Sequence, residues 1–149
     1  MNAESSDNAP DLTAAGTFQH WTPVSLRFSD QDSMGHINNV AYAAYVEQSR
    51  VAFLNDFLRA QGGGAIDYIL ASVNIDYRCE MHFPGTVDIG ARFMRIGTKS
   101  ITTAYGLFKD GENVATAGSA NVFFDFQSGK TIPIPDDLKK ILETESTKG

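Results

Sequence analysis

Hydrophobic and polar residues alternate along several segments of the chain, which is the pattern of half-buried β-strands. From residue 21 to residue 30, Val24, Leu26 and Phe28 share one face. After residue 66 the alternation recurs in four segments, which run over residues 73–79, 87–93, 101–107 and 114–124. Asp110-Gly111, between the last two, favours a tight hairpin turn. The pattern predicts one strand, followed later by a meander of antiparallel strands.

Between the first strand and the meander, apolar residues recur at helical spacing from about Asn38 to Arg59. One apolar stripe contains Val40, Ala44, Val51, Leu54 and Leu58, and a second, on nearly the opposite side, contains Tyr42, Val46 and Phe53. Apolar residues on two sides predict a helix that other elements largely enclose. Glycines 62–64 end this helix, and Pro135-Asp136 predicts the start of a short C-terminal one.

The order of elements indicates the fold class. A strand, a long helix and then several strands joined by tight turns predict an α+β domain, with an antiparallel sheet curled around the helix. A βαβ Rossmann unit would need parallel strands joined by helices. The length of 149 residues suits one domain. We expect a flexible polar tail over residues 1–17 and a single domain over residues 18–149.

Composition and charge narrow the cellular compartment and the class of binding partner that we expect. No stretch approaches the roughly 20 apolar residues of a membrane span, and the polar start lacks the features of a signal peptide. The lone Cys79 excludes an internal disulfide and favours a reducing compartment, so we expect the cytoplasm. The formal net charge of −6 argues against a nucleic-acid-binding protein.

The loop before the long helix is dense in reactive side chains: Asp30, Asp32, His36, Asn38 and Asn39. One interpretation is capping, because such side chains bond the free N–H groups of a helix start. The other is catalysis, since a helix N-terminus can polarise a carbonyl group while a nearby carboxylate acts as base or nucleophile. The two interpretations are compatible, and both stay open at this point.

Glu47 lies within the Val40–Leu58 stripe, where a buried carboxylate would need a partner or a pocket. It is interpreted either as an ion-pair partner of Arg50 or Arg78, or as a site residue. Met34 and Ala41 stand where a calcium loop needs oxygen ligands, and the spacing of the three histidines does not suggest zinc. No Gly-x-Ser-x-Gly elbow exists, and Cys79 lies inside a predicted strand. We therefore expect neither metal nor organic cofactor.

A family resemblance follows from these residues. The pattern Arg27-Phe28-x-Asp30-x-Asp32-x-Met34-Gly35-His36-x-Asn38-Asn39-x-x-Tyr42, with Glu47 and Arg50 downstream, resembles the 4-hydroxybenzoyl-CoA thioesterase-like branch of the hotdog superfamily. Ile75-Asp76-Tyr77-Arg78, Gly97-x-Lys99-Ser100 and Ala120-x-Val122-Phe123-Phe124-Asp125 are also similar. The resemblance implies a hotdog fold, homodimers or homotetramers with sites at the subunit interface, Asp32 as the catalytic carboxylate, and backbone N–H groups near Asn39 facing the thioester carbonyl.

Plant acyl-ACP thioesterases carry a similar pattern, which Asp32 and His36 match, although Met34 replaces the catalytic Asn. The predicted function is hydrolysis of acyl-CoA thioesters by Asp32, with His36, Asn39 and Glu47 completing the site. Lys99 is chosen, among several surface cations, to bind coenzyme A phosphates. The alternatives are an acyl-ACP thioesterase and a hotdog protein that binds acyl-CoA without cleaving it. A hydratase ranks below both, because the loop does not resemble hydratase motifs.

Overall fold

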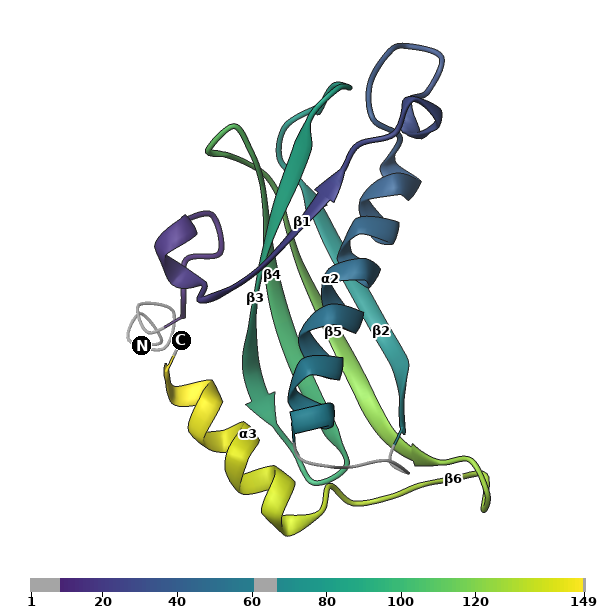
Figure 1. Ribbon diagram of the computed structural model, residues 1–149, viewed down its shortest axis with the longest axis vertical. Coiled ribbons are helices and arrows are strands. Elements are labelled where there is room, and N and C mark those ends of the chain that lie inside the picture. Colours follow the sequence, from purple (N-terminus) through teal and green to yellow (C-terminus); the bar gives the residue numbers. More distant parts are fainter. Residues whose placement is uncertain (1–8, 61–66, 149) are drawn as a thin grey trace, which may run out of the picture.

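One antiparallel sheet forms most of the molecule. The structure is a computed structural model that describes residues 9–60 and 67–148. The strands are β1 (His20–Ser25), β2 (Asp67–Tyr77), β3 (Thr86–Ile96), β4 (Ser100–Lys109), β5 (Glu112–Asp125) and β6 (Lys130–Thr131). They lie in the order β1-β3-β4-β5-β2, with β6 paired to β5, and all pairs are antiparallel. Figure 1 shows the long strands curving past the central helix.

Over the described ranges the fold also contains two helices and the 3₁₀ turns η1 (Ala15–Thr17) and η2 (Phe28–Asp30). Helix α2 (Asn39–Ala60) crosses one face of the sheet, and α3 (Asp136–Lys148) packs against β3 (Figure 1). The core lies between α2 and the sheet, where Val46, Leu54 and Tyr105 are fully buried. The predicted α+β class, with a sheet curled around a long helix, is confirmed.

Local signals located the element boundaries well. The helix predicted from Asn38 to Arg59 runs from Asn39 to Ala60, and the Asn38 side chain accepts the Val40 N–H at 2.7 Å. The predicted glycine stop at residues 62–64 lies outside the described residues. Asp110 and Gly111 have φ values of 54° and 81°, the left-handed backbone that a two-residue hairpin turn requires. Capping and turn chemistry therefore confirm the predicted order of elements.

The first strand ends earlier than predicted. Strand β1 stops at Ser25, and Phe28, which was expected on the buried face, is 76% exposed. The cause is Asp30, whose N–H donates to the Arg27 carbonyl at 2.9 Å while its Oδ2 accepts the Arg27 N–H at 3.1 Å. These bonds close η2 and break the alternation. The prediction of a strand up to residue 30 was wrong because side-chain hydrogen bonding overrides the hydrophobic pattern.

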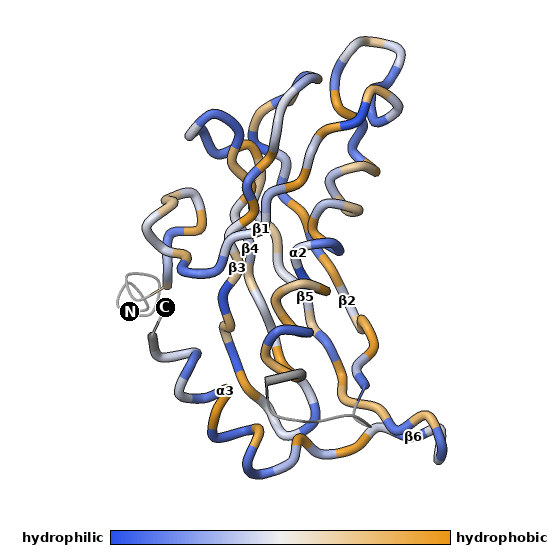
Figure 2. The backbone as a smooth tube through the Cα atoms, viewed as in Figure 1, coloured by the Kyte–Doolittle hydropathy of each residue, from blue (hydrophilic) through white to orange (hydrophobic). Residues whose placement is uncertain are grey.

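The prediction that α2 is enclosed on two sides was also wrong for a single chain. The strip containing Tyr42, Val46 and Phe53 is buried against the sheet. On the other stripe Leu54 is also buried, but Val40 and Val51 are 74% and 42% exposed. Strand β2, at the sheet edge, is exposed along most of its length, and Figure 2 shows hydrophobic positions on it. One chain supplies one sheet, which covers only one side of the helix.

The predicted tail is ordered in its described part. Residues 9–17 contain η1, the Thr17 hydroxyl donates to the Asp11 carbonyl at 2.6 Å, and the Thr17 carbonyl accepts from Arg92 Nη1 at 3.3 Å. The ordered chain thus begins before the predicted boundary at Phe18, while residues 1–8 lie outside the described residues. Neither α2 nor α3 has the length and apolar character that a membrane crossing requires.

Candidate active site

The loop between η2 and α2 is folded around Asp32. Its Oδ1 accepts the N–H groups of Met34 at 2.9 Å and of His36 at 3.1 Å. The Asp32 N–H donates to the His36 carbonyl at 2.8 Å, and Gly35 adopts a φ of 79° at the turn. In the described part of the chain, Oδ2 of Asp32 has no hydrogen-bond partner. One carboxylate oxygen therefore holds the loop, and the other is exposed for chemistry.

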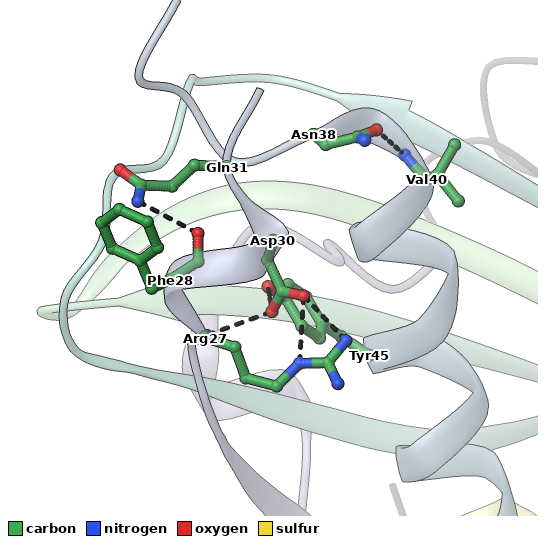
Figure 3. A network of polar contacts seen from close by, with 7 residues as sticks. All are labelled: Arg27, Phe28, Asp30, Gln31, Asn38, Val40 and Tyr45. Carbon is green, nitrogen blue, oxygen red and sulfur yellow. Dashed lines mark hydrogen bonds and ion pairs between the residues drawn. The ribbon is translucent and has the colours of Figure 1, made fainter. Parts of the chain in front are cut away.

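The neighbouring Asp30 has a different environment (Figure 3). Its side chain is buried and accepts hydrogen bonds from Arg27 Nε and Nη2 at 3.1 and 2.9 Å and from the Tyr45 hydroxyl at 2.7 Å. Burial by itself would raise the pKa of Asp30, but the hydrogen bonds from Arg27 and Tyr45 and the charge of Arg27 lower it overall. Burial and the bond to Asp30 raise the pKa of Tyr45. Asp30 therefore anchors the loop to α2.

The start of α2 leaves one backbone donor available. Asn38 accepts the Val40 N–H through its side chain (Figure 3). Its carbonyl accepts the Ala41 N–H at 2.9 Å. Over residues 9–60 and 67–148, no hydrogen bond to the Asn39 N–H is found. This N–H lies at the positive end of a 22-residue helix. The Asn39 carbonyl accepts the Tyr77 hydroxyl at 3.2 Å, which ties the helix start to β2.

These groups meet in one cleft of about 270 Å³. Asp32, His36 and Asn39 line it from the loop and the helix start. The opposite wall comes from the end of β2 and the residues after it, and the remaining lining residues are Ile37, Tyr42, Tyr77, Arg78, Cys79 and Glu80. The structure thus brings together a carboxylate, an imidazole and a helix N-terminus, which are the parts that acyl transfer with an anionic intermediate needs.

Comparisons with known proteins identify the family. The profile described as the thioesterase-like superfamily matches residues 26–142. The chain belongs to this superfamily. It is 28% identical to the uncharacterized protein YsmA of Bacillus subtilis (strain 168) over 127 residues, covering 85% of this chain and 86% of YsmA. It is 24% identical to the long-chain acyl-CoA thioesterase FadM of Escherichia coli (strain K12), covering 82% of this chain and 96% of FadM.

Solved structures agree with this assignment. A predicted thioesterase from Bacillus stearothermophilus superposes with a TM-score of 0.76 at 27% identity, covering 84% of this chain and 94% of that chain. The present superfamily member therefore has the hotdog fold, and its general activity is thioester hydrolysis.

Two of the predicted site residues of this thioesterase lie outside the cleft. The Glu47 side chain is 67% exposed, lies 3.5 Å from Arg50 Nη2, and lines a separate pocket of about 600 Å³ between β1 and α2. The ion pair with Arg50 is present, but Glu47 is not buried as the stripe suggested. Lys99 lies in the β3–β4 turn, at the end of the sheet near β6, whereas α2 begins at the other end (Figure 1). Within a single chain, neither Glu47 nor Lys99 shares the cleft of Asp32.

Sequence reasoning missed three residues of the cleft that follow β2. Cys79 was placed inside a strand, which was wrong: β2 ends at Tyr77, and Cys79 is exposed. Arg78 supplies a cation to the cleft, and in the described part of the chain it forms no ion pair. Glu80 lies between two histidines. The available signal was the Tyr77-Arg78 dipeptide, which was used for the family resemblance, while Arg78 by itself was considered only as an ion-pair partner of Glu47.

The same region could hold a metal ion. His36 Nε2 and His82 Nε2 lie 2.8 and 2.9 Å from Glu80 Oε2. The spacing of the histidines along the chain does not reveal this grouping, because the fold joins positions more than 40 residues apart. Among the described residues, this is the cluster of three or more histidine, cysteine, aspartate or glutamate side chains whose ligand atoms lie close enough to share an ion.

Proposed function

We propose that this protein is an acyl-CoA thioesterase in which Asp32 supplies the reactive carboxylate and the Asn39 N–H stabilises the oxyanion. The observation that carries the proposal is the common cleft of Asp32, His36 and Asn39 at the start of α2. The similarity to FadM, a long-chain acyl-CoA thioesterase, supports coenzyme A as the carrier. Acyl-ACP is the alternative carrier.

Asp32 suits the reactive role better than Asp30. The buried Asp30 carboxylate is fully engaged with Arg27 and Tyr45, so it has no oxygen available to a substrate. Asp32 is exposed in the cleft and keeps Oδ2 available. Asp32 either takes a proton from the attacking water or attacks the thioester carbon itself. Both routes need the ionised carboxylate beside the carbonyl group.

The negative oxygen that develops in either route needs a hydrogen-bond donor that folding has not used. The Asn39 N–H meets this requirement, and the helix dipole adds a favourable potential at the same place. His36, on the same wall, would orient water or the thioester sulfur. The leaving thiolate takes up the proton that water gave up, so that free acid and thiol are the products.

Arg78 is the cation that the cleft offers to the substrate phosphates, since guanidinium groups bind phosphate through paired hydrogen bonds. We expect Arg78→Ala to raise KM for a coenzyme A thioester and to leave KM unchanged for the matching pantetheine thioester, which has no nucleotide phosphates. Lys99→Ala is the comparison, because Lys99 lies away from this cleft. Equal KM changes for both thioesters in Arg78→Ala would remove Arg78 from phosphate binding.

We propose further that a second copy of the chain covers the exposed side of α2 and the edge of β2, as the predicted dimer requires. Val51 on α2 and Ile69, Leu70 and Val73 on β2 are each at least 40% exposed. No strand of the described chain pairs with the outer edge of β2, and such an edge readily adds another strand. A role of Glu47 at the site would then operate across this interface. The exposed, free Cys79 thiol suits the cytoplasm.

A substrate panel with Asp32 variants tests the function. Acyl-CoA and acyl-ACP of several chain lengths, and aromatic acyl-CoA, are incubated with the wild type, Asp32→Asn and Asp32→Ala, and loss of the thioester absorbance is followed. We expect both variants to lose turnover while retaining the circular dichroism of the wild type. Near-normal hydrolysis by Asp32→Asn would refute the role of Asp32. Tight binding of acyl-CoA by the wild type without hydrolysis would favour the non-catalytic alternative.

A further inference from the structure

Two histidines and a glutamate form a compact group at the rim of the cleft. His36 belongs to the loop before α2, and Glu80 and His82 belong to the segment between β2 and β3. His36 Nε2 lies 2.8 Å and His82 Nε2 lies 2.9 Å from the same oxygen, Glu80 Oε2. The three ligand atoms all lie within 4.8 Å of one another, and the imidazole rings are perpendicular with centroids 5.1 Å apart.

The backbone fixes this group from both sides. Met81, which separates Glu80 from His82, is buried, so its two exposed neighbours project away from the core. The Met81 carbonyl accepts the Ile37 N–H at 2.8 Å, which joins the segment directly beside His36. The His36 carbonyl in turn accepts the Asp32 N–H at 2.8 Å. The backbone bonds therefore bring the two segments that carry the ligand atoms together.

The hydrogen-bond partners of His82 leave its Nε2 available to a ligand. Its Nδ1 lies 3.2 Å from the Gly35 carbonyl, which can only accept, so Nδ1 carries a proton. A neutral imidazole then presents a lone pair at Nε2, and this lone pair faces the Glu80 carboxylate at 2.9 Å. Two acceptors at this distance need a cation between them, either a second proton or a metal ion. An Nδ1–H bonded to a carbonyl, with Nε2 left to a ligand, is the usual arrangement of metal-binding histidines.

We propose that His36, Glu80 and His82 bind a divalent transition-metal ion of the Zn²⁺ class. Two imidazole nitrogens and one carboxylate oxygen suit Zn²⁺, Co²⁺ or Ni²⁺, whereas Ca²⁺ and Mg²⁺ prefer oxygen ligands alone. Ligand atoms about 2.0–2.1 Å from a tetrahedral zinc ion lie about 3.3 Å apart. Reaching that spacing needs only small outward movements of the exposed Glu80 and His82 side chains. The ion would join the loop to the segment after β2.

Metal titration of tag-free, chelator-treated protein tests the proposal. We expect calorimetry to show saturable binding of one Zn²⁺ per chain. His82→Gln and Glu80→Gln should weaken it at least about 100-fold, because loss of an outer partner alone costs about 10–100-fold. The matched control is His20→Gln, since His20 forms the other described histidine–glutamate pair, with Glu145 at 3.3 Å. Unchanged binding in His20→Gln is expected. Absence of saturable binding, or equal binding in His82→Gln and wild type, would overturn the proposal.

Thermal unfolding gives a second readout that does not depend on any enzymatic activity. Zn²⁺ at a hundredfold excess over its dissociation constant should raise the unfolding midpoint of the wild type by about 5–10 °C. The midpoint of His82→Gln should not move, and Mg²⁺ should have no effect on either protein. A shift of equal size in His82→Gln would assign the ion to another place and overturn the proposal.

Binding of an ion at this site should also affect catalysis, an expectation that rests on the proposed function. The bound ion would occupy His36 Nε2, so that this nitrogen could no longer act on water or substrate in the cleft, and Zn²⁺ should therefore inhibit hydrolysis by the wild type. It should spare His82→Gln, whose substituted residue does not line the cleft. Binding without inhibition would retain the metal site and remove His36 from the catalytic group. Absence of Zn²⁺ binding together with normal hydrolysis would overturn the metal site and leave the proposed function intact, so the two proposals fail separately.

Discussion

Replacing Asn39 by proline isolates the backbone donor on which the proposed mechanism depends. Asn39 is the first residue of α2, and proline is favoured at this position because its missing N–H is not needed by the helix. The preceding Asn38 caps the helix from outside it, so the restriction that proline places on its predecessor is compatible with the fold. The Asn39 carbonyl, which accepts the Tyr77 hydroxyl, is retained.

The expected loss follows from how the first turn of α2 uses its donors. The N–H groups of Val40 and Ala41 already bond to Asn38, so that among the described residues the Asn39 N–H is the donor of this turn that has no partner. Removing one oxyanion donor typically lowers kcat by about 10²–10³-fold, or about 2.7–4 kcal/mol in the barrier. The free energy of unfolding should change by less than about 1 kcal/mol, since a compatible proline mainly restricts the unfolded chain.

Steady-state kinetics with Asn39→Ala as the matched control separates this donor from the side chain. Asn39→Ala removes the carboxamide and keeps the N–H, so its kcat should stay within a few-fold of the wild type. Asn39→Pro should lose turnover while its KM and its unfolding midpoint remain near those of the wild type. Wild-type turnover in Asn39→Pro, or an equal loss in Asn39→Ala, would refute the backbone role.

Three further predictions concern stability and assembly. Asp30→Ala leaves the buried Tyr45 hydroxyl without its acceptor and should cost about 1–3 kcal/mol in urea unfolding, whereas the exposed Asp32→Ala should cost less; the opposite ranking would contradict the assignment of the two aspartates. Because the folded pKa of Asp30 is lowered, the stability that wild type gains over Asp30→Asn should be constant above about pH 4, the unfolded value, and should decline as pH falls further. A gain that grew on acidification would show that the sign is wrong. Val51→Glu should shift light-scattering mass toward the monomer while Thr98→Glu, at an exposed turn, leaves it unchanged; identical masses would exclude α2 from the interface.

Most of the fold could be predicted because its signals are local. The start of α2 follows from Asn38 as a cap, and the last hairpin follows from Asp110-Gly111, each within a few residues of the feature it sets. The two apolar sides of α2 were equally clear in the sequence. The hydrophobic pattern indicates that both sides of the helix are covered, but it does not indicate whether the same chain or a second one covers Val51.

The candidate site likewise contains residues that could be predicted from the sequence and residues that could not. Asp32, His36 and Asn39 lie within eight positions of one another, so their meeting at the helix start could be predicted. Arg78 and Glu80 reach the same cleft because long-range backbone bonds, such as those from Ile37 to Met81 and from Arg78 to Val114, position their segment, and spacing gives no signal for such bonds. Lys99 was chosen for its charge alone, and charge carries no information about the end of the sheet on which a residue lies.

The lone thiol has a practical consequence for measuring this enzyme. Cys79 is exposed and lines the same cleft as Asp32, so reagents that detect released coenzyme A by reacting with thiols will also label the protein. Such labelling would consume reagent without any turnover and would place a bulky group in the cleft proposed to bind the substrate. A low rate measured with such a reagent would then reflect labelling of Cys79 and not slow hydrolysis. A Cys79→Ser background, or a readout that needs no thiol reagent, avoids the artefact.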